Sequence, residues 1–130
     1  MSRIVAQKTQ LQKVRDFLDR ILNSDENEIQ RAAAIQAFEV GFELAWKYLK
    51  TLVEENGTLA ASPKSVFREA AKQRLLESPE IWFDFLVVRN STVHTYIEEL
   101  ANEVYKFIRV SFLGELDKLI GIEIENLDRN

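Results

Sequence analysis

The chain of 130 residues contains no cysteine and a single histidine, His94. Without cysteine there can be no disulfide, no thiolate nucleophile and no cysteine-based zinc site. A lone imidazole argues against a zinc or non-haem iron site, because such sites usually take two or three imidazole ligands. We therefore expect no metal ion and no other cofactor.

Long apolar runs are also missing. The N-terminal stretch "MSRIVAQKTQLQKVRD" lacks the apolar core of a signal peptide, and no later stretch is long enough to span a bilayer. We expect a cytoplasmic protein without membrane contact, so the glycosylation sequon at Asn90 is discounted. The net charge of −4 argues against a non-specific nucleic-acid coat, although a local basic site is compatible with it.

Helix breakers are scarce, with four glycines and two prolines. Apolar residues recur three and four positions apart, as in amphipathic helices. This pattern predicts three long helices, over 4–22, 28–55 and 96–120. It also predicts a short helix opened by Ser62-Pro63 and a further helix that is opened by Ser78-Pro79 and ends near Asn90. A frayed tail is expected after 120. Ser24 or Asp25 is expected to cap the second helix. The prediction is one all-α domain over 1–130, an antiparallel up-and-down bundle of four long helices plus a short one.

The helix expected over 28–55 has two apolar faces. One carries Phe38, Phe42, Ala45, Leu49 and Leu52, and the other carries Ala37, Val40, Gly41, Leu44 and Tyr48. A helix that is apolar over so much of its circumference must be covered on two sides. We expect the core on one side and a second copy of the chain on the other. Gly41 costs about 1 kcal/mol relative to alanine inside a helix, so another backbone is expected to approach it closely.

The stretch "RNSTVHTY", residues 89–96, brings several side chains that could take part in a reaction to the segment between the last two helices. Arg89 is expected at a helix C-terminus, and His94 at or just before the next helix N-terminus, whose free N–H groups could bind an anion. A guanidinium can bind two phosphate oxygens and an imidazole can move a proton near neutral pH. RNA cleavage needs little more, because the 2′-hydroxyl is a nucleophile already in place. The alternative is structural: Arg89 favours the helix dipole and His94 caps a helix.

The segment 89–96 resembles the Arg-x4-His-x-Tyr motif of HEPN domains. Its context is "QAFEVGFELAWKYLKTLVEENG", then "SPKSVFREAAKQRLL", then "WFDFLVVRNSTVHTYIEELANEVY". From about 11 to 120 the chain is similar to the HepT-like branch, long described as nucleotidyltransferase substrate-binding proteins. The resemblance implies that Arg89 and His94 are the catalytic pair and that Tyr96 is a modified residue, and Asn90 also fits the motif.

The same resemblance implies a biological role. It implies an all-α homodimer in which two copies of the motif face each other, and a metal-independent endoribonuclease that acts as a toxin. The antitoxin partner that it implies is a minimal nucleotidyltransferase that adds AMP to the motif tyrosine. An AMP on Tyr96 would place a negative charge beside Arg89 and His94, and would thereby repel the RNA phosphate.

Several other side chains could support such a site. Lys64, Arg68 and Lys72 share one helix face, with Arg74 nearby, and could bind an RNA backbone; the alternative is a solvated helix face. Glu39 and Glu43 could orient Arg89 or His94, or lie at the rim of a dimer contact. The aromatic residues are expected to be structural: Trp46, Tyr48, Trp82, Phe83 and Phe85.

The sequence therefore favours a HepT-like ribonuclease toxin and leaves two alternatives. In the first, the protein is a non-catalytic subunit that binds nucleotide or substrate and pairs with a nucleotidyltransferase. In the second, it is a structural adaptor in which the motif has no role.

Overall fold

The computed structural model describes residues 2–124, and every regular element in them is helical. The helices are α1 (Arg3–Leu22), α2 (Glu28–Glu55), α3 (Pro63–Lys72), α4 (Glu80–Ser91) and α5 (Glu98–Ile120), with a 3₁₀ helix, η1 (Thr92–His94), between the last two. The predicted all-α class is confirmed. The long helices are α1, α2 and α5, with 20, 28 and 23 residues, whereas α3 and α4 have 10 and 12. The expected tail beyond 124 lies outside the described residues.

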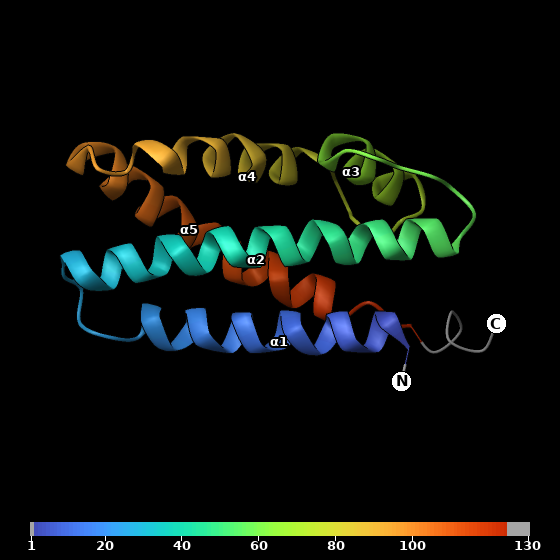
Figure 1. The fold of residues 1–130 in the computed structure, drawn as a ribbon, viewed down its shortest axis with the longest axis horizontal. Coiled ribbons are helices and arrows are strands. Elements are labelled where there is room, and N and C mark those ends of the chain that lie inside the picture. The colour runs from blue at the N-terminus through green and yellow to red at the C-terminus, as the bar shows by residue number, and fades with distance from the viewer. Residues whose placement is uncertain (1, 125–130) are drawn as a thin grey trace.

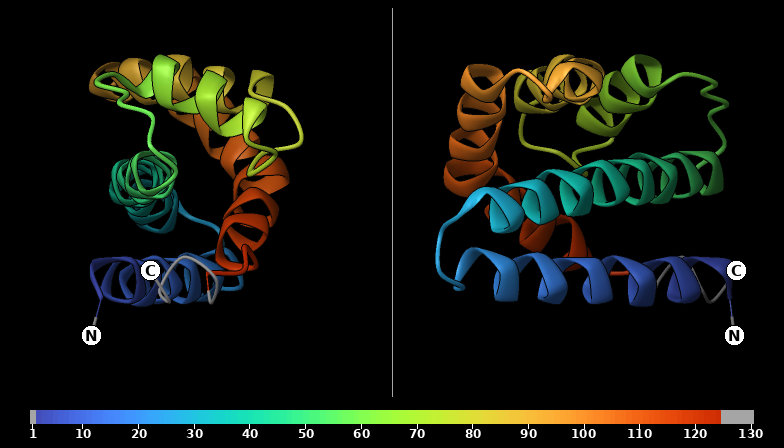
Figure 2. Two further views of the ribbon diagram at one scale, coloured as in Figure 1. Left: turned by 90° about the vertical axis from the view of Figure 1, so that its right-hand side faces the viewer. Right: turned by 60° about the vertical axis from the view of Figure 1, so that its left-hand side comes forward.

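Helix α2 occupies the centre of the bundle (Figure 1). It runs antiparallel to α1, while α3 and α4 lie on the side of α2 away from α1 (Figures 1 and 2). Helix α5 leaves the end of η1 and crosses α2 obliquely to reach α1 (Figure 2). Helix α2 therefore contacts all four other α-helices, and two of its neighbours meet at the segment that carries Arg89 and His94.

Local side-chain chemistry sets the helix ends. Ser62 caps α3 through a reciprocal capping box with Ser65, and Pro63 occupies the first turn, as expected. The cap predicted for α2 is wrong: Asn27, rather than Ser24 or Asp25, accepts the backbone N–H of Gln30 at 2.9 Å. The loop after α1 therefore continues to Asn27, directly before the first helical residue.

Arg74 adopts a left-handed backbone conformation after α3, with φ of 62°. The N–H of Leu75 donates to the carbonyl of Ala70 at 2.8 Å, and that of Arg74 donates to Ala71 at 3.1 Å. These two bonds form a Schellman motif, whose left-handed position usually belongs to glycine. An arginine at this position is a local source of backbone strain.

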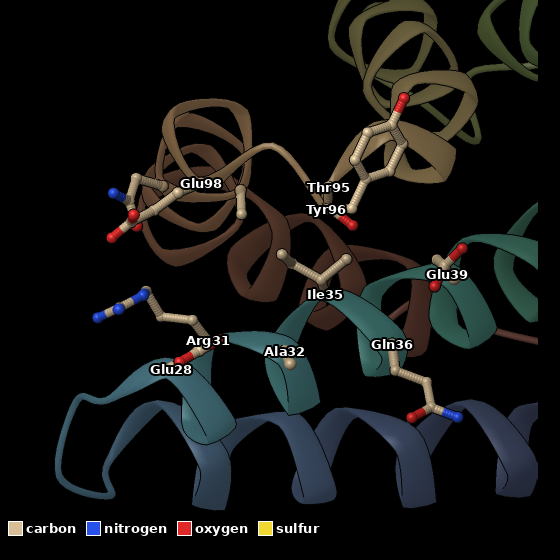
Figure 3. A pocket seen from close by; sticks show the side chains of 11 residues that line it. Glu28, Arg31, Ala32, Ile35, Gln36, Glu39, Thr95, Tyr96 and Glu98 are labelled. Carbon is tan, nitrogen blue, oxygen red and sulfur yellow. The ribbon is translucent and has the colours of Figure 1, made fainter.

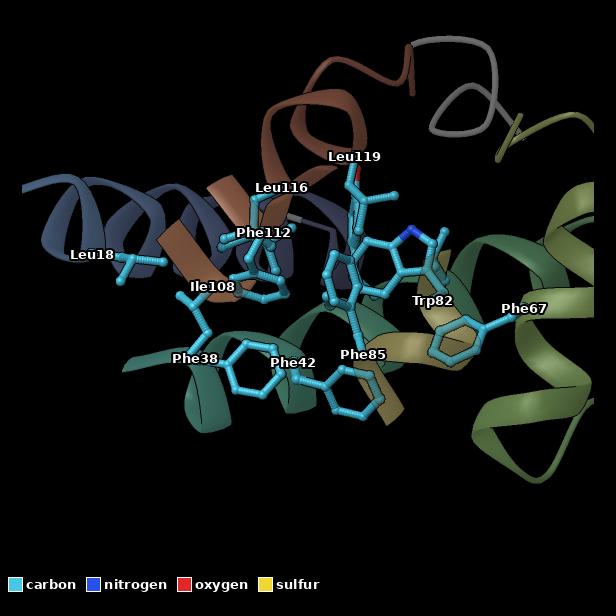
Figure 4. Close-up of a cluster of buried hydrophobic side chains, with 14 of the residues drawn as sticks. Leu18, Phe38, Phe42, Phe67, Trp82, Phe85, Ile108, Phe112, Leu116 and Leu119 are labelled. Carbon is cyan, nitrogen blue, oxygen red and sulfur yellow. The ribbon is translucent and has the colours of Figure 1, made fainter. Parts of the chain in front are cut away.

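Aromatic rings from four helices make the centre of the core (Figure 4). Phe38 of α2 meets Phe112 of α5 edge to face at a centroid distance of 4.7 Å, and Trp82 of α4 meets Phe85 in the same way at 4.9 Å. All four rings are buried. Such contacts add to the free energy of burial. Phe85 of α4 also meets Phe112 edge to face at 5.0 Å and Phe38 at 6.3 Å, and these contacts fix α4 against α5 and α2. The structural interpretation of Trp82 and Phe85 is confirmed.

The chain itself covers much of the second apolar face of α2, where Val40 is 47% exposed; the contact of this face with a second copy stays a prediction. Ala37, Gly41 and Tyr48 are buried within one chain. A Cβ built on Gly41 would lie 3.1 Å from Cε2 of Phe112, a ring of α5. The close neighbour of Gly41 is therefore an aromatic ring of the same chain rather than another backbone.

A polar network closes the C-terminus of α1. Tyr105 of α5 accepts hydrogen bonds from Gln30 Nε2 at 2.9 Å and from Arg109 Nη1 at 3.1 Å. The same Gln30 and Arg109 atoms donate to the carbonyls of Ile21 and Leu22, at 2.9 and 3.1 Å. The carbonyl of Leu22, which α1 leaves unpaired, is thereby satisfied from α5, and that of Ile21, which also accepts the N–H of Ser24 at 3.1 Å, is bonded from α2. These bonds tie together the three long helices.

Candidate functional site

Hydroxyl side chains shape the turn that carries the candidate catalytic residues. After Arg89, in the last turn of α4, the hydroxyls of Ser91, Thr92 and Thr95 each lie 2.7–2.8 Å from a backbone carbonyl three residues earlier. Such bonds compete with the regular helix ladder, and the chain tightens into η1. Helix α5 then begins at Glu98, two residues later than predicted, and the carbonyl of His94 accepts the N–H of Ile97 at 3.0 Å. His94 therefore ends η1 and does not stand at the N-terminus of α5.

Arg89 is held by side chains from two elements. Its Nη1 lies 3.4 Å from Oε2 of Glu39 on α2 and donates to Oγ1 of Thr92 at 3.3 Å. Thr92 Oγ1 is also 2.9 Å from the same carboxylate oxygen. Both contacts engage Nη1 alone. The Nε of Arg89 is buried and has no hydrogen-bond partner among residues 2–124, so the contacts of Glu39 and Thr92 hold the guanidinium through one nitrogen.

His94 and Tyr96 lie side by side at the surface. Their ring centroids are 6.1 Å apart and the rings meet edge to face at 70°. Tyr96 is 80% exposed, so its hydroxyl is accessible to another molecule. Asn90 is exposed in the last turn of α4. Arg89, His94 and Tyr96 thus lie in one short segment that runs from the end of α4 to the start of α5.

The two candidate supporting acids occupy different surroundings. Glu39 contacts Arg89 and Thr92, whereas Glu43 accepts a hydrogen bond from Trp46 Nε1 at 3.1 Å and lies 4.0 Å from Lys47 Nζ. The partners of Glu43 belong to its own helix. Only Glu39 is therefore brought to the candidate catalytic segment.

The basic face of α3 stands apart from this segment. Lys64, Arg68 and Lys72 are exposed, and the guanidinium of Arg68 stacks on the ring of Phe83 at 5.5 Å. Helix α3 adjoins the beginning of α4, whereas Arg89 lies at the end of α4 (Figure 1). Within one chain, these cations do not line a path into the Arg89 site.

A groove that the sequence did not reveal opens beside Tyr96, with a volume of about 580 Å³. We call it the α2–α5 groove (Figure 3), and it is lined by Glu28, Arg31, Ala32, Ile35, Gln36, Glu39, Thr95, Tyr96, Glu98, Ala101 and Asn102. The α2 residues recur at helical spacing, but the lining residues on α5 are 59 or more positions away in the chain, since Glu98 follows Glu39 by 59. Spacing alone therefore could not predict this groove.

Three apolar side chains in and next to the candidate segment are exposed. Val87, Val93 and Ile97 are 67%, 65% and 46% exposed. They belong to α4, η1 and the turn before α5, so they flank Arg89 and His94 in the chain. A group of exposed aliphatic side chains is typical of a contact surface.

Two properties bear on metal and membrane binding. Within residues 2–124, no group of three or more His, Asp or Glu side chains is arranged to hold a metal ion. None of the helices described combines the length and the apolar character that a membrane span requires.

Comparison with known proteins finds a family whose model matches nearly the whole chain. Residues 2–121 match the family described as "Nucleotidyltransferase substrate binding protein like". A Haemophilus influenzae protein named "Probable ribonuclease HepT" is 34% identical over 94 residues, which cover 65% of this chain and 64% of that protein. The chain thus matches just under two thirds of the length of this relative.

Two solved structures share the fold. A protein from Thermus thermophilus superposes with a TM-score of 0.78 and 33% identity, covering 85% of this chain and 96% of that one. A second protein, from Haemophilus influenzae, superposes with a TM-score of 0.68 and 28% identity, covering 96% of both chains. Its structure is described as revealing the fold of a substrate binding domain of a nucleotidyltransferase.

Proposed function

Because the chain belongs to the family of nucleotidyltransferase substrate binding protein-like proteins, we propose that it is a HepT-like endoribonuclease that cleaves RNA without a metal ion. The observation that carries the proposal is the position of the Arg89 guanidinium, whose Nη1 is held by Glu39 and Thr92 at the end of α4. His94 follows in the same segment. The relative named as a ribonuclease supports the same activity.

The proposed reaction uses one acid–base group and one electrostatic group. His94 takes the proton from the RNA 2′-hydroxyl, whose oxygen attacks the adjacent phosphorus. The bond from phosphorus to the 5′-oxygen breaks, and that oxygen receives a proton from a protonated imidazole. The products are a 2′,3′-cyclic phosphate and a 5′-hydroxyl. Arg89 binds the phosphate oxygens and stabilises the charge that builds up on them.

The active form in this proposal is a homodimer, with two candidate segments facing each other. The exposed side chains of Val87, Val93 and Ile97 support this arrangement, because burying them against a second copy would bring both sites into one cleft. The test is sedimentation of the wild-type protein and of Val93→Glu. The proposal expects a dimer that the substitution dissociates, whereas a wild-type monomer at the concentration of the RNA assay contradicts it.

Regulation in this proposal passes through Tyr96. A minimal nucleotidyltransferase, acting as antitoxin, transfers AMP from ATP to the tyrosine oxygen and releases pyrophosphate. The exposure of Tyr96 and its 6.1 Å ring separation from His94 support this step, because the new phosphate would lie near the catalytic imidazole. Tyr96→Phe is expected to cleave RNA but to resist silencing; a variant that the transferase still silences contradicts this step.

Incubation of the purified protein with total RNA in EDTA, beside His94→Ala, tests the activity. Cleavage by the wild type that His94→Ala lacks is the expected result. Intact RNA with both proteins refutes the nuclease and supports the alternative, a non-catalytic nucleotide-binding subunit that pairs with a nucleotidyltransferase. In that alternative, Arg89 binds phosphate without cleaving RNA.

A further inference from the structure

The α2–α5 groove is lined by both polar and apolar side chains. Ala32, Ile35 and Ala101 contribute the apolar surface. Gln36 of α2 and Asn102 of α5 are among the lining residues, and Figure 3 shows the amide of Gln36 directed toward α1. An amide offers both donors and an acceptor. The volume of about 580 Å³ lies within the range of small-molecule sites. A flat polar ring can therefore pack against the apolar side chains of the groove and form hydrogen bonds with its polar side chains.

The charges of the groove exclude phosphate from most of its length. Glu28 and Glu98 line it, and the one cation among its lining residues, Arg31, lies 3.3 Å from Glu26. A phosphate would be repelled there, whereas a carboxylate accepts hydrogen bonds from ring amino groups. Adenine, guanine and cytosine carry such amino groups, and uracil does not. The groove thus suits an uncharged ring with amino donors.

The position of the groove connects it with the candidate active site. It begins at Glu39, whose carboxylate holds Arg89, and Tyr96 stands at the same end (Figure 3). Arg31 lies at the opposite end (Figure 3). A nucleotide whose phosphate is bound at Arg89 can therefore direct its base along α2 and away from the charged site.

We propose that the α2–α5 groove is a nucleobase-binding subsite for the nucleotide whose phosphate lies at Arg89. The inference rests on the proposed function for the position of that phosphate. The base comes either from the RNA strand at the cleavage point or from an AMP attached to Tyr96. Both sources present the same chemistry to the groove, a ring with an amino group beside a phosphate.

The direct test is an NMR titration of the unmodified protein with AMP, GMP, CMP and UMP. The signals observed are the side-chain amides of Gln36 and Asn102. Ala32→Phe fills the groove from an exposed helix position, and Ala6→Phe makes the same change at an exposed position of α1 outside it. This design separates loss of the groove from the general effect of a new surface aromatic ring.

The expected result is a shift of both amide signals with AMP, GMP and CMP, with weaker binding of UMP. Ala6→Phe should behave as wild type, and Ala32→Phe should bind about tenfold more weakly. The proposal is overturned if the amide signals do not move, or if Ala32→Phe binds as Ala6→Phe does. This titration does not depend on nuclease activity. A protein that cleaves no RNA would therefore refute the proposed function, whereas the titration would still show whether the groove binds a base.

Two further measurements on an active protein distinguish the sources of the base. If the base belongs to the RNA, Ala32→Phe changes which nucleotide precedes the cleaved bond, as read from sequenced cleavage products. If the base belongs to AMP on Tyr96, Ala32→Phe keeps that preference but regains cleavage after modification. If the substitution changes neither property, the proposal is overturned, because a bound base then has no link to the phosphate at Arg89.

Discussion

Glu39 on α2 and Arg89 on α4 form an ion pair, with 3.4 Å between Oε2 and Nη1. Thr92 lies 2.9 Å from the same carboxylate oxygen and 3.3 Å from the same guanidinium nitrogen. The three groups form a closed triangle that joins two packed helices. In the proposed function, a guanidinium held in this way is oriented before the phosphate binds, so the ion pair would preorganise the candidate site.

The first prediction concerns this ion pair. Glu39→Gln keeps the shape of the side chain but removes its charge, so Arg89 is held less firmly. We expect kcat/KM for RNA cleavage to fall about tenfold, which corresponds to ~1.4 kcal/mol. Glu43→Gln is the matched control, because Glu43 contacts Trp46 and Lys47 of its own helix. Equal losses in the two variants would show that Glu39 has no specific role.

The hydroxyl of Thr92 gives the second prediction. Thr92 is buried, and its Oγ1 contacts both Glu39 and Arg89. Thr92→Val preserves the shape and removes the hydroxyl, so cleavage should fall about tenfold. Thr92→Ser keeps the hydroxyl and should retain most of the activity, although the lost methyl group costs about 0.8 kcal/mol of stability. A serine variant as inactive as the valine variant would contradict this role.

The strained backbone of Arg74 gives a prediction about stability. Its φ of 62° is costly for a residue with a Cβ and costs glycine little. Arg74→Gly should therefore raise the free energy of unfolding by about 0.5–1 kcal/mol, after allowance for the greater entropy of glycine in the unfolded chain. Lys72→Gly, within α3, should lower it by about 1 kcal/mol. Urea unfolding measures both, and a destabilised Arg74→Gly would contradict the strain argument.

Two buried tyrosines differ in their hydroxyl partners, and this difference gives the fourth prediction. Tyr105→Phe removes the acceptor of Gln30 Nε2 and Arg109 Nη1 and should cost about 1–2 kcal/mol. The hydroxyl of Tyr48 has no partner among residues 2–124, and burial raises the pKa of that hydroxyl to about 12. Tyr48→Phe should therefore leave the unfolding free energy at pH 7 nearly unchanged. Thermal unfolding compares the two, and equal losses would refute the role of the network.

The sequence predicted the helices well because their signals are local. The apolar stripe of α1, with Leu11, Leu18 and Ile21, is buried as its spacing predicted. Ser62 and Pro63 start α3, and the stop at Asn56-Gly57 ends α2. Each of these signals depends on residues within one or two turns.

The site was harder to predict because its contacts join distant segments. Glu39 and Glu43 are one turn apart on α2, and only the packing of α4 across that helix selects Glu39. The ring of Phe112 that lies close to Gly41 comes from α5. The start of α5 was misplaced because side-chain hydroxyls tighten the preceding turn into η1, a competition that periodicity does not detect.

In the proposed function, Arg89 and His94 act on the same RNA phosphate. The most direct test measures single-turnover cleavage of one defined RNA in EDTA by wild type, Arg89→Ala, His94→Ala and the double variant. Groups that act as a unit are not additive, so we predict that both single variants lose at least about a thousandfold in rate and that the double variant is no slower than either. A single variant that cleaves at the wild-type rate would contradict the claim.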